Sequence, residues 1–502
     1  MGSSMGGTAK VTIRALKWHH VAGALVLGVF FFLLYMRVGG QETLLTGTTG
    51  PEAPAVSGGE GREVWMDILQ EGRKIGYTHR SLFREDGAWR FVDTMVMRVN
   101  TMGVVQGLAI SSRGRLKADL TLSSFAMDLS SNLFRFAARG EVRGRRLVLW
   151  AGPPGEMRRY DLVLKEAPYL GVSVLPAAWG AARGKGSASL SVFDPATLGV
   201  RPVKIKILGE ETLQIGGKPL RLTKVAVDFM GSPQYAWVDR DGEIYREEGA
   251  LGLALVRTTR EEALRPLPEA PAADLTLAAS VPVDGALPDP ARLTVLTVAV
   301  EGVSSGNFLL DGGRQSWQGG LLTVRREDGA PPLPARGEAW EAKRFLRDTP
   351  FIQAEHPDIV AAVGRITKAA DGEEEKARQI VRWVFENVAK RPVLSLSNAV
   401  ETLHRRMGDC TEHAVLVAAL GRAAGIPTVV ETGLVHQGGR FYYHAWNSFY
   451  LASRGTWVTA DAVMDQMPAD VTHLRFQRGE AEDHLEIAAL MGRLRLKIRE
   501  AR

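Results

Sequence analysis

Hydrophobic residues recur at helical spacing in the segment ahead of the only cysteine of the chain. Intervals of three and four residues place apolar side chains on one face of an α-helix. The positions that follow this spacing are Ala377, Ile380, Val381, Val384, Phe385 and Val388. Asp371 precedes them and is a suitable cap. The pattern predicts a helical layer before the cysteine.

A second helix is predicted to begin at the cysteine itself. Ala414 to Leu420 is an apolar run, and Asp409 with Glu412 three residues later forms a capping-box pattern. The Gly-Ile-Pro stretch at 425–427 supplies a stop. Cys410 then lies in the first turn, where unpaired backbone N–H groups and the positive end of the helix dipole stabilise a thiolate.

The segment after this helix reads as a hairpin. Phe441 to Leu451 is rich in aromatic residues and predicts a strand that carries His444. Gly455 indicates a turn to a second strand, which ends at Asp461. Cross-strand neighbours lie roughly 5 Å apart. We therefore expect a hydrogen bond between His444 and Asp461.

Earlier in the chain, short alternating runs separated by turn residues predict antiparallel sheet from residue 63 to 264. The hairpin signals are Asp86-Gly87, Gly216-Gly217 and Asp241-Gly242. Residues 265–335 are interpreted as a linker followed by a small β module, because proline-rich stretches flank two alternating runs. Residues 481–502 are predicted to form a C-terminal helix, which from Leu485 onward is basic and amphipathic.

An apolar run from Val21 to Met36 follows Lys10, Arg14 and Lys17 near the N-terminus. Its length is at the short edge of the roughly 17 to 25 residues that span a bilayer, so a signal peptide is the competing interpretation. We expect a cytoplasmic N-terminus at 1–18 and a transmembrane signal anchor at 19–38. The basic residues ahead of the run predict that the rest of the chain is extracytoplasmic, in the periplasm. Residues 39–62 read as a flexible linker.

Composition excludes several function classes. The net charge of +6 is modest for 502 residues, and basic residues alternate with acidic ones, which gives no support to nucleic-acid binding. No cysteine pair or His-Glu-x-x-His helix is present, so no metal site is expected. No cofactor is expected either. One cysteine allows no intrachain disulfide, which suits an exported protein whose single thiol serves chemistry.

Cys410, His444 and Asp461 together supply a nucleophile, a base and a group that orients the base. Each has a plainer interpretation: a lone cysteine is more often a small buried hydrophobe, and the other two could be ordinary strand and turn residues. The helix start at Cys410 and the joint occurrence of the three types favour a site for thiol acyl transfer. The backbone N–H of Cys410 is the candidate oxyanion donor.

Gly408-Asp409-Cys410, the helix ending in Gly421 to Pro427, the His444-Ala445-Trp446 strand and the Trp457 to Asp461 strand resemble the transglutaminase-like superfamily. The resemblance covers roughly residues 340 to 480 and implies an α+β fold with a papain-like core at 336–480. It implies that Cys410 is the nucleophile, His444 the general base and acid, and Asp461 the orienting carboxylate. Ala462-Val463 departs from the Pro-Thr commonly found after the aspartate.

The resemblance implies attack on a carboxamide or peptide carbonyl, followed by resolution of a thioester by water or by an amine. The two outcomes, a protease or amidase and a cross-linking transglutaminase, stay open. For an anchored protein we expect a protein or peptide substrate, with cell-envelope proteins as possible partners of the β domains. The alternative is a membrane-tethered scaffold with a vestigial triad.

Overall fold

The computed structural model describes residues 61–502 apart from several gaps. The gaps are 133, 156, 183–184, 196–197, 230–231, 269–271, 286, 304–307, 328–341, 393–397, 481–486 and 488–489. The predicted segments 1–18 and 19–38, and the linker 39–62 except for its last two residues, lie outside the described part of the chain. Within the described part, no helix combines the length and the apolar character that crossing a membrane requires.

Fifteen described strands form one sheet that is antiparallel except for a single parallel pair, β9 with β10. Strand β1 lies between β2 and β15, so the sheet runs from β1 out to β8 and from β15 back to β9. The strands are β1 (Gly61–Gln70), β2 (Arg73–Glu85), β3 (Ala88–Thr101), β4 (Val104–Leu116), β5 (Leu122–Ser131), β6 (Arg135–Arg143), β7 (Arg146–Gly152), β8 (Arg158–Val163), β9 (Tyr169–Leu170), β10 (Ser187–Asp194), β11 (Gly199–Ile215), β12 (Lys218–Phe229), β13 (Ser232–Val238), β14 (Ile244–Glu248) and β15 (Leu253–Thr258). The predicted β-rich character of this region is confirmed.

Tight turns set the register of these strands. Asp86 and Gly87 join β2 to β3 with φ of 50° and 75°, and Gly216 and Gly217 join β11 to β12 with φ of 57° and 76°. Two successive positive φ angles match the twist of the flanking strands. Helix α3 (Gly171–Ala182) packs Val174 and Ala178 against buried residues of the same sheet.

A second sheet of nine strands contains the predicted hairpin. Its order is β18-β19-β17-β26-β16-β23-β22-β25, and β24 pairs with β23. The strands are β16 (Val281–Asp284), β17 (Val295–Glu301), β18 (Gln315–Gln318), β19 (Leu321–Arg325), β22 (Thr428–Gln437), β23 (Arg440–Leu451), β24 (Thr456–Ala460), β25 (Leu474–Gly479) and β26 (Arg495–Ala501).

The small β module assigned to 265–335 is not separate from the predicted catalytic region. Strand β16 pairs with β23 through Val281 and Phe441, and parallel to β26 on its other side. Leu296 and Val298 of β17 share one buried cluster with Phe441. A common sheet and a common core therefore join the two regions.

The predicted C-terminal helix is wrong for the residues that the structure describes. Arg495–Ala501 forms β26, which lies between β17 and β16. Leu496 is buried and Ile498 half-buried, whereas Arg495, Lys497 and Arg499 are exposed. This alternation has the period of two that belongs to a strand with one buried face.

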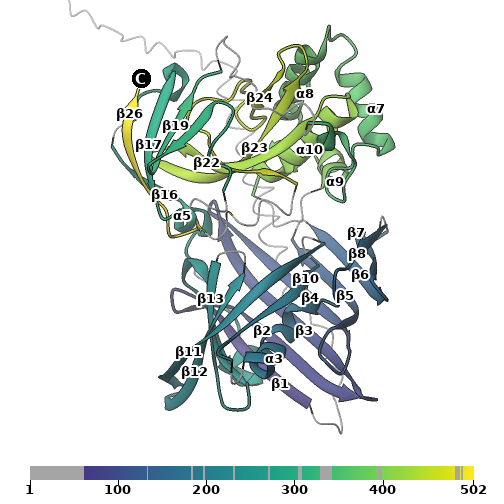
Figure 1. Cartoon of the computed structure of the whole chain (residues 1–502), viewed down its shortest axis with the longest axis vertical. Helices are drawn as coiled ribbons and strands as arrows, with labels where there is room; N and C mark the ends of the chain where they lie inside the picture. The colour runs from purple at the N-terminus through teal and green to yellow at the C-terminus, as the bar shows by residue number, and fades with distance from the viewer. Residues whose placement is uncertain are drawn as a thin grey trace, which may run out of the picture. The chain divides into compact units, whose positions relative to one another are not determined.

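Four helices gather along β22 and β23 (Figure 1). They are α7 (Pro357–Ile366), α8 (Glu373–Asn387), α9 (Ala399–Arg405) and α10 (Cys410–Ala423). Helix α8 carries the predicted apolar stripe, with Ala377, Ile380, Val381 and Val384 buried. Its cap is Gly372 at φ 86° and not Asp371, and no side chain caps it. A glycine adopts this positive φ without steric cost.

The remaining described elements are short. They are α4 (Arg260–Ala263), α5 (Leu275–Ala279), the 3₁₀ turns η1 (Ala250–Gly252), η2 (Pro290–Arg292) and η3 (Lys343–Leu346), and the parallel pair β20 (Ala389–Lys390) and β21 (Met407–Gly408). Strand β21 ends two residues before Cys410, and its pairing with β20 fixes the chain at the entry to α10.

Candidate active site

The start of α10 has the capping geometry that the sequence predicts. The Thr411 backbone N–H donates to Asp409 Oδ1 at 2.8 Å, and the Asp409 backbone N–H donates to Glu412 Oε2 at 2.8 Å. Cys410 is the first helical residue and is half-buried. Its sulfur therefore lies at the end of the helix that favours negative charge.

Removal from water and the neighbouring Glu412 carboxylate raise the pKa of Asp409 well above its ordinary value. The raised pKa of Asp409 limits the negative charge that its carboxyl group places at the start of α10. Gly408 is needed for this fold, because a Cβ there would overlap the Glu412 side chain.

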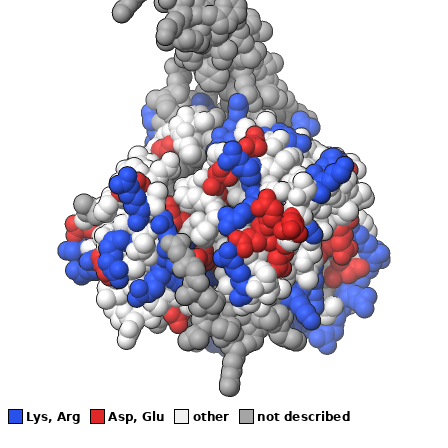
Figure 2. All heavy atoms as spheres, turned by 90° about the horizontal axis from the view of Figure 1, so that it is seen from above, with Lys and Arg blue, Asp and Glu red and all other residues white. Residues whose placement is uncertain are grey.

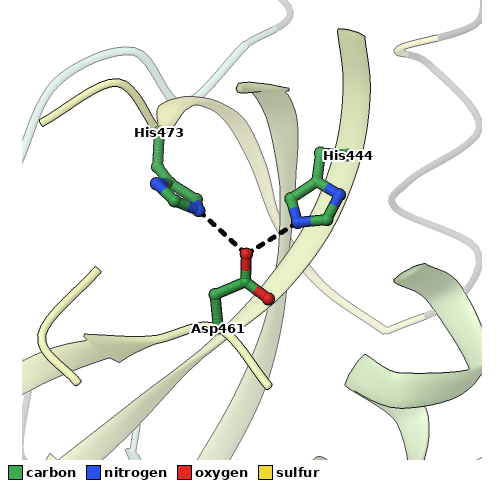
Figure 3. A group of neighbouring side chains, drawn as sticks. All are labelled: His444, Asp461 and His473. Carbon is green, nitrogen blue, oxygen red and sulfur yellow. Dashed lines mark hydrogen bonds and ion pairs between the residues drawn. The ribbon is translucent and has the colours of Figure 1, made fainter. Parts of the chain in front are cut away.

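His444 and Asp461 meet as predicted. His444 lies in β23, Asp461 follows β24, and Gly455 with φ 64° lies in the connecting turn. His444 Nε2 donates to Asp461 Oδ2 at 2.8 Å, and both side chains are buried (Figure 3). Cys410 lies close enough to His444 to raise its pKa. Because Nε2 is engaged with Asp461, Nδ1 is the ring nitrogen available to the sulfur.

Charge raises the proton affinity of His444. Burial lowers its pKa, but the charge of Asp461, the hydrogen bond that His444 donates to it and the proximity of Cys410 outweigh burial and raise the pKa to about 9. Burial likewise raises the pKa of Asp461, and His444 and His473 more than reverse this, so that the pKa falls well below its ordinary value. Both shifts favour the ion pair, an imidazolium facing a carboxylate.

The turn after Asp461 fixes its carboxylate. The Val463 backbone N–H donates to Asp461 Oδ1 at 2.7 Å, and the backbones of Asp461 and Gln466 exchange two hydrogen bonds. Residue 463 contributes only its backbone N–H, which any residue except proline supplies. The Ala462-Val463 departure therefore leaves the orientation of the carboxylate intact.

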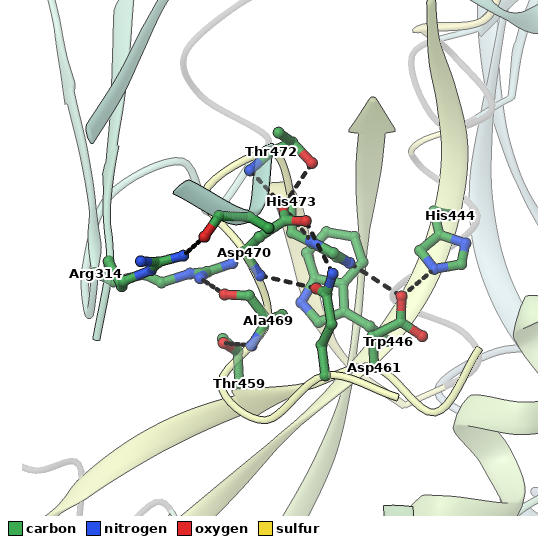
Figure 4. Close-up of polar contacts among 12 residues, drawn as sticks. Arg314, His444, Trp446, Thr459, Asp461, Ala469, Asp470, Thr472 and His473 are labelled. Carbon is green, nitrogen blue, oxygen red and sulfur yellow. Dashed lines mark hydrogen bonds and ion pairs between the residues drawn. The ribbon is translucent and has the colours of Figure 1, made fainter. Parts of the chain in front are cut away.

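A second histidine was missed as part of the site. His473 donates from Nε2 to Asp461 Oδ2 at 3.0 Å. Its Nδ1 lies 3.2 Å from Asp470 Oδ1 (Figure 4). Asp461 Oδ2 thus accepts hydrogen bonds from two imidazoles. In the sequence, only the Asp-x-x-His spacing of Asp470 and His473 indicates a contact of His473, and that contact is the one with Asp470.

Trp446 packs beside both imidazole rings. Its ring centroid lies 6.2 Å from that of His444, nearly parallel, and 5.1 Å from that of His473, nearly perpendicular. Trp446 Nε1 donates to Glu431 Oε2 at 2.9 Å, and Arg478 pairs with the same carboxylate at 2.6 Å. The indole ring separates the imidazoles from this buried ion pair.

Three polar side chains from the segment ahead of Cys410 have structural partners. Asn387 Nδ2 donates to the Trp383 carbonyl at 2.9 Å, Asn398 caps α9, and His404 pairs with Asp358 at 2.9 Å. The guanidinium of Arg406 lies over the Trp383 ring. The Cys410 backbone N–H, in the unpaired first turn of α10, remains the candidate donor.

The polar atoms of His444, Asp461 and His473 lie within 4.8 Å of one another, a spacing that metal ligands also show. Here both imidazole nitrogens point at the same carboxylate oxygen at hydrogen-bond distance. An N–H that donates to a carboxylate has no lone pair for a metal. The geometry is that of a hydrogen-bonded charge cluster.

Comparison with known families places these residues in a defined domain. Residues 360–462 match the model of the transglutaminase-like superfamily, and the match includes Cys410, His444 and Asp461. This chain carries a transglutaminase-like domain. The resemblance drawn from the sequence motifs is thereby confirmed. A search of curated proteins finds no match to the chain.

Three solved structures share weak similarity with the chain. One, described as a candidate cysteine protease from Cytophaga hutchinsonii, is 16% identical over 42% of this chain and 84% of its own, with a TM-score of 0.26. A β-barrel-like protein of unknown function from Brucella abortus is 8% identical over 39% and 95%, with a TM-score of 0.31. A candidate protease from Parabacteroides distasonis is 12% identical over 68% of each chain, with a TM-score of 0.19.

Close packing behind His444 in the transglutaminase-like domain yields a stability prediction. Gly433 lies opposite His444 in β22, and a Cβ there would overlap the Leu474 carbonyl oxygen and the Trp446 ring. Gly433→Ala is expected to lower the free energy of unfolding by about 1–3 kcal/mol through overpacking. Urea unfolding measures this.

The matched control is Gly364→Ala in α7, where a Cβ meets nothing within 4 Å. Alanine there is expected to be neutral or to stabilise by about 0.5–1 kcal/mol. Equal effects of the two substitutions would contradict the close packing of β22 against β25.

Proposed function

We propose that this chain is a cysteine-dependent acyl transferase or hydrolase that acts on carboxamide or peptide bonds through a thioester. The observation that carries the proposal is the contact series from Cys410 at the start of α10 to the buried His444 and Asp461. Such a series prepares a thiolate next to an imidazolium, which is the resting form that this chemistry needs.

The proposed steps use the groups at hand. The Cys410 thiolate attacks the carbonyl carbon, the C–S bond forms, and the first-turn backbone N–H groups of α10 stabilise the oxyanion. The C–N bond then breaks as the His444 imidazolium gives its Nδ1 proton to the leaving amine. Neutral His444 next takes a proton from water or from an acceptor amine, which attacks the thioester and releases the thiolate.

One experiment can determine whether water or an amine accepts the acyl group. The full chain in detergent is incubated with peptides from digested envelope proteins, a biotinylated primary amine and ¹⁸O-labelled water. Mass spectrometry then distinguishes ¹⁸O in new carboxyl groups, the mark of hydrolysis, from attached amine, the mark of transfer. Either product should be absent with Cys410→Ser. If the parent yields neither product and its thiol reacts like a free cysteine, the scaffold alternative replaces the enzyme.

A pH prediction follows from the charge on His444. The imidazolium must be present to protonate the leaving amine, and its pKa is raised from 6.5 to about 9. We expect kcat/KM to hold through neutral pH and to fall as pH rises through about 9, tenfold per unit. The apparent pKa of this alkaline limb is a property of the coupled Cys410–His444 pair. If kcat/KM has already fallen at pH 7, Asp461 does not keep the proton on His444.

We also propose that the enzyme is a single-pass protein of the inner membrane with its catalytic part in the periplasm. The support is the basic N-terminus followed by the apolar run from Val21 to Met36. Protease added to spheroplasts should remove a C-terminal tag, and the tag should stay with the membrane fraction before digestion. A tag that is protected until lysis would contradict this orientation.

The proposed substrate is a protein or a peptide, and an envelope protein is the proposed partner of the large sheet. Figure 2 shows one face of the molecule, on which basic and acidic side chains are interspersed. Arg454 and Arg378, for example, both pair with Glu374. Mixed charge of this kind suits a polar peptide better than a polyanion.

A further inference from the structure

His473 contacts a carboxylate with each of its ring nitrogens. Nε2 lies 3.0 Å from Asp461 Oδ2, and Nδ1 lies 3.2 Å from Asp470 Oδ1. A neutral imidazole has one N–H and one lone pair, so it satisfies only one of two such acceptors. Both contacts are satisfied when both nitrogens carry protons. The geometry therefore makes His473 an imidazolium, with a fully buried side chain.

Asp470 is held so that it remains an acceptor. Its Oδ1 also accepts from the backbone N–H of Thr472 at 2.8 Å and from the Thr472 hydroxyl at 2.6 Å, while Oδ2 accepts from Gln466 Nε2 at 3.0 Å. Burial raises the pKa of Asp470, and the bonds from His473 and its neighbours lower it well below the ordinary value. Burial lowers the pKa of His473, and the hydrogen bonds that it donates to Asp461 and Asp470 reverse this and raise it.

We propose that His473 is a positioning residue. Its positive charge interacts with the same Asp461 carboxylate as His444 does, and this limits how tightly His444 holds its proton. The inference deepens the proposed function and rests on it. The ring centroids of the two histidines are 5.9 Å apart. Without a second cation, the buried Asp461 would act on His444 alone, and an imidazolium held too firmly is a poor acid toward a leaving amine.

Further charged groups lie close to the residues that contact this pair, and none of them hydrogen-bonds Asp461 in place of His473. Glu431 is balanced by Arg478 and Arg475 beyond Trp446, and Arg314 donates to the Ala469 carbonyl. Asp461 also acts on His413 of α10 and Asp470 on His436 of β22, and burial lowers the pKa of both histidines. The described titratable and charged groups around His444 and His473 include Cys410, His413, Glu431, His436, Asp461, Asp470, Arg314, Arg475 and Arg478.

The test follows the proton on His444 without using turnover. Iodoacetate is an anion that responds to the imidazolium beside Cys410, whereas iodoacetamide is neutral. The ratio of their labelling rates on the full chain should therefore fall as His444 loses its proton, near pH 9 in the parent. In His473→Gln, which keeps an N–H donor but no charge, the midpoint should rise by about one to two pH units. This is the size expected for a unit charge about 6 Å away at an effective dielectric constant near 20.

Asp470→Asn serves as a second variant if His473→Gln fails to fold, and it should also raise the midpoint because it weakens the hold on the second proton. His404→Gln, at an exposed histidine paired with Asp358, is the matched control and should leave the midpoint unchanged. In the parent labelled with ¹⁵N-histidine, both ring nitrogens of His473 should give NMR signals of protonated nitrogen at pH 7.

The outcomes distinguish failure of the proposed function from failure of the proposed role of His473. A labelling ratio that is independent of pH in the parent removes the ion pair and with it the proposed function. A normal parent midpoint that does not move in either variant, or a neutral His473 by NMR, overturns the role of His473 and leaves the triad standing. A loss of stability without a shift in the midpoint likewise assigns His473 to packing alone.

Discussion

Cys410→Ala is expected to abolish turnover, with kcat reduced by roughly 10⁴-fold or more, because no other described side chain at the start of α10 can form the thioester. The fold should survive. Cys410 is half-buried at the edge of the helical core, and alanine is a better helix former, so the free energy of unfolding should change by less than about 1 kcal/mol. Mass spectrometry of the products and urea unfolding measure the two effects.

Labelling of the thiol distinguishes a dead nucleophile from a collapsed site. The parent chain should react with iodoacetamide rapidly at pH 6 to 7, and His444→Ala should react markedly more slowly there, because the imidazolium that favours the thiolate is gone. A parent thiol that is sluggish and indifferent to His444 would point to a structural cysteine. Residual turnover by Cys410→Ala close to that of the parent would place the nucleophile elsewhere.

The helix start at Cys410 and the contact between His444 and Asp461 were predictable, because each depends on a local pattern. The Asp409 to Glu412 capping box fixes the helix start, and the turn at Gly455 brings the two strands together within a short stretch of chain. Interactions of this range are encoded in spacing alone. The same holds for the hairpins of the large sheet, whose turn residues occur where the sequence indicated them.

Long-range pairing escaped prediction. Strand β26 lies between β17 (Val295–Glu301) and β16 (Val281–Asp284), which come from a distant part of the chain, and no local pattern indicates such a neighbour. The basic, amphipathic stretch from Leu485 onward was interpreted as a helix, although Arg495–Ala501 within it alternates with the period of a strand. His473 was missed for a similar reason: its contact with Asp461 depends on the path of the turn between them.

The contact of His473 with Asp461 changes the description of the site more than the pairing of β26 changes that of the fold. A triad of three residues from one hairpin and one helix becomes part of a buried charge series that extends through Asp461 to His473 and Asp470. The carboxylate is the element that both histidines share. Its substitution therefore tests catalysis and stability together.

Asp461→Asn is expected to lower kcat/KM by roughly 10²- to 10⁴-fold at neutral pH, as loss of the carboxylate does in related triads. The charge of Asp461 is the main cause that raises the pKa of His444 to about 9. Without it, burial lowers that pKa, so the alkaline limb should move down by more than one unit. The pH profile of kcat/KM, or the iodoacetate-to-iodoacetamide ratio, measures the shift.

Asp461→Ala adds a cost that asparagine avoids. It leaves two buried histidines without their shared acceptor and should destabilise the fold by about 3–5 kcal/mol, the range for removing one partner of a buried ion pair. Asparagine keeps the shape and one oxygen, so its loss of stability should be smaller. If the alkaline limb of the Asp461→Asn variant stays near pH 9, the charge on Asp461 does not set the proton affinity of His444.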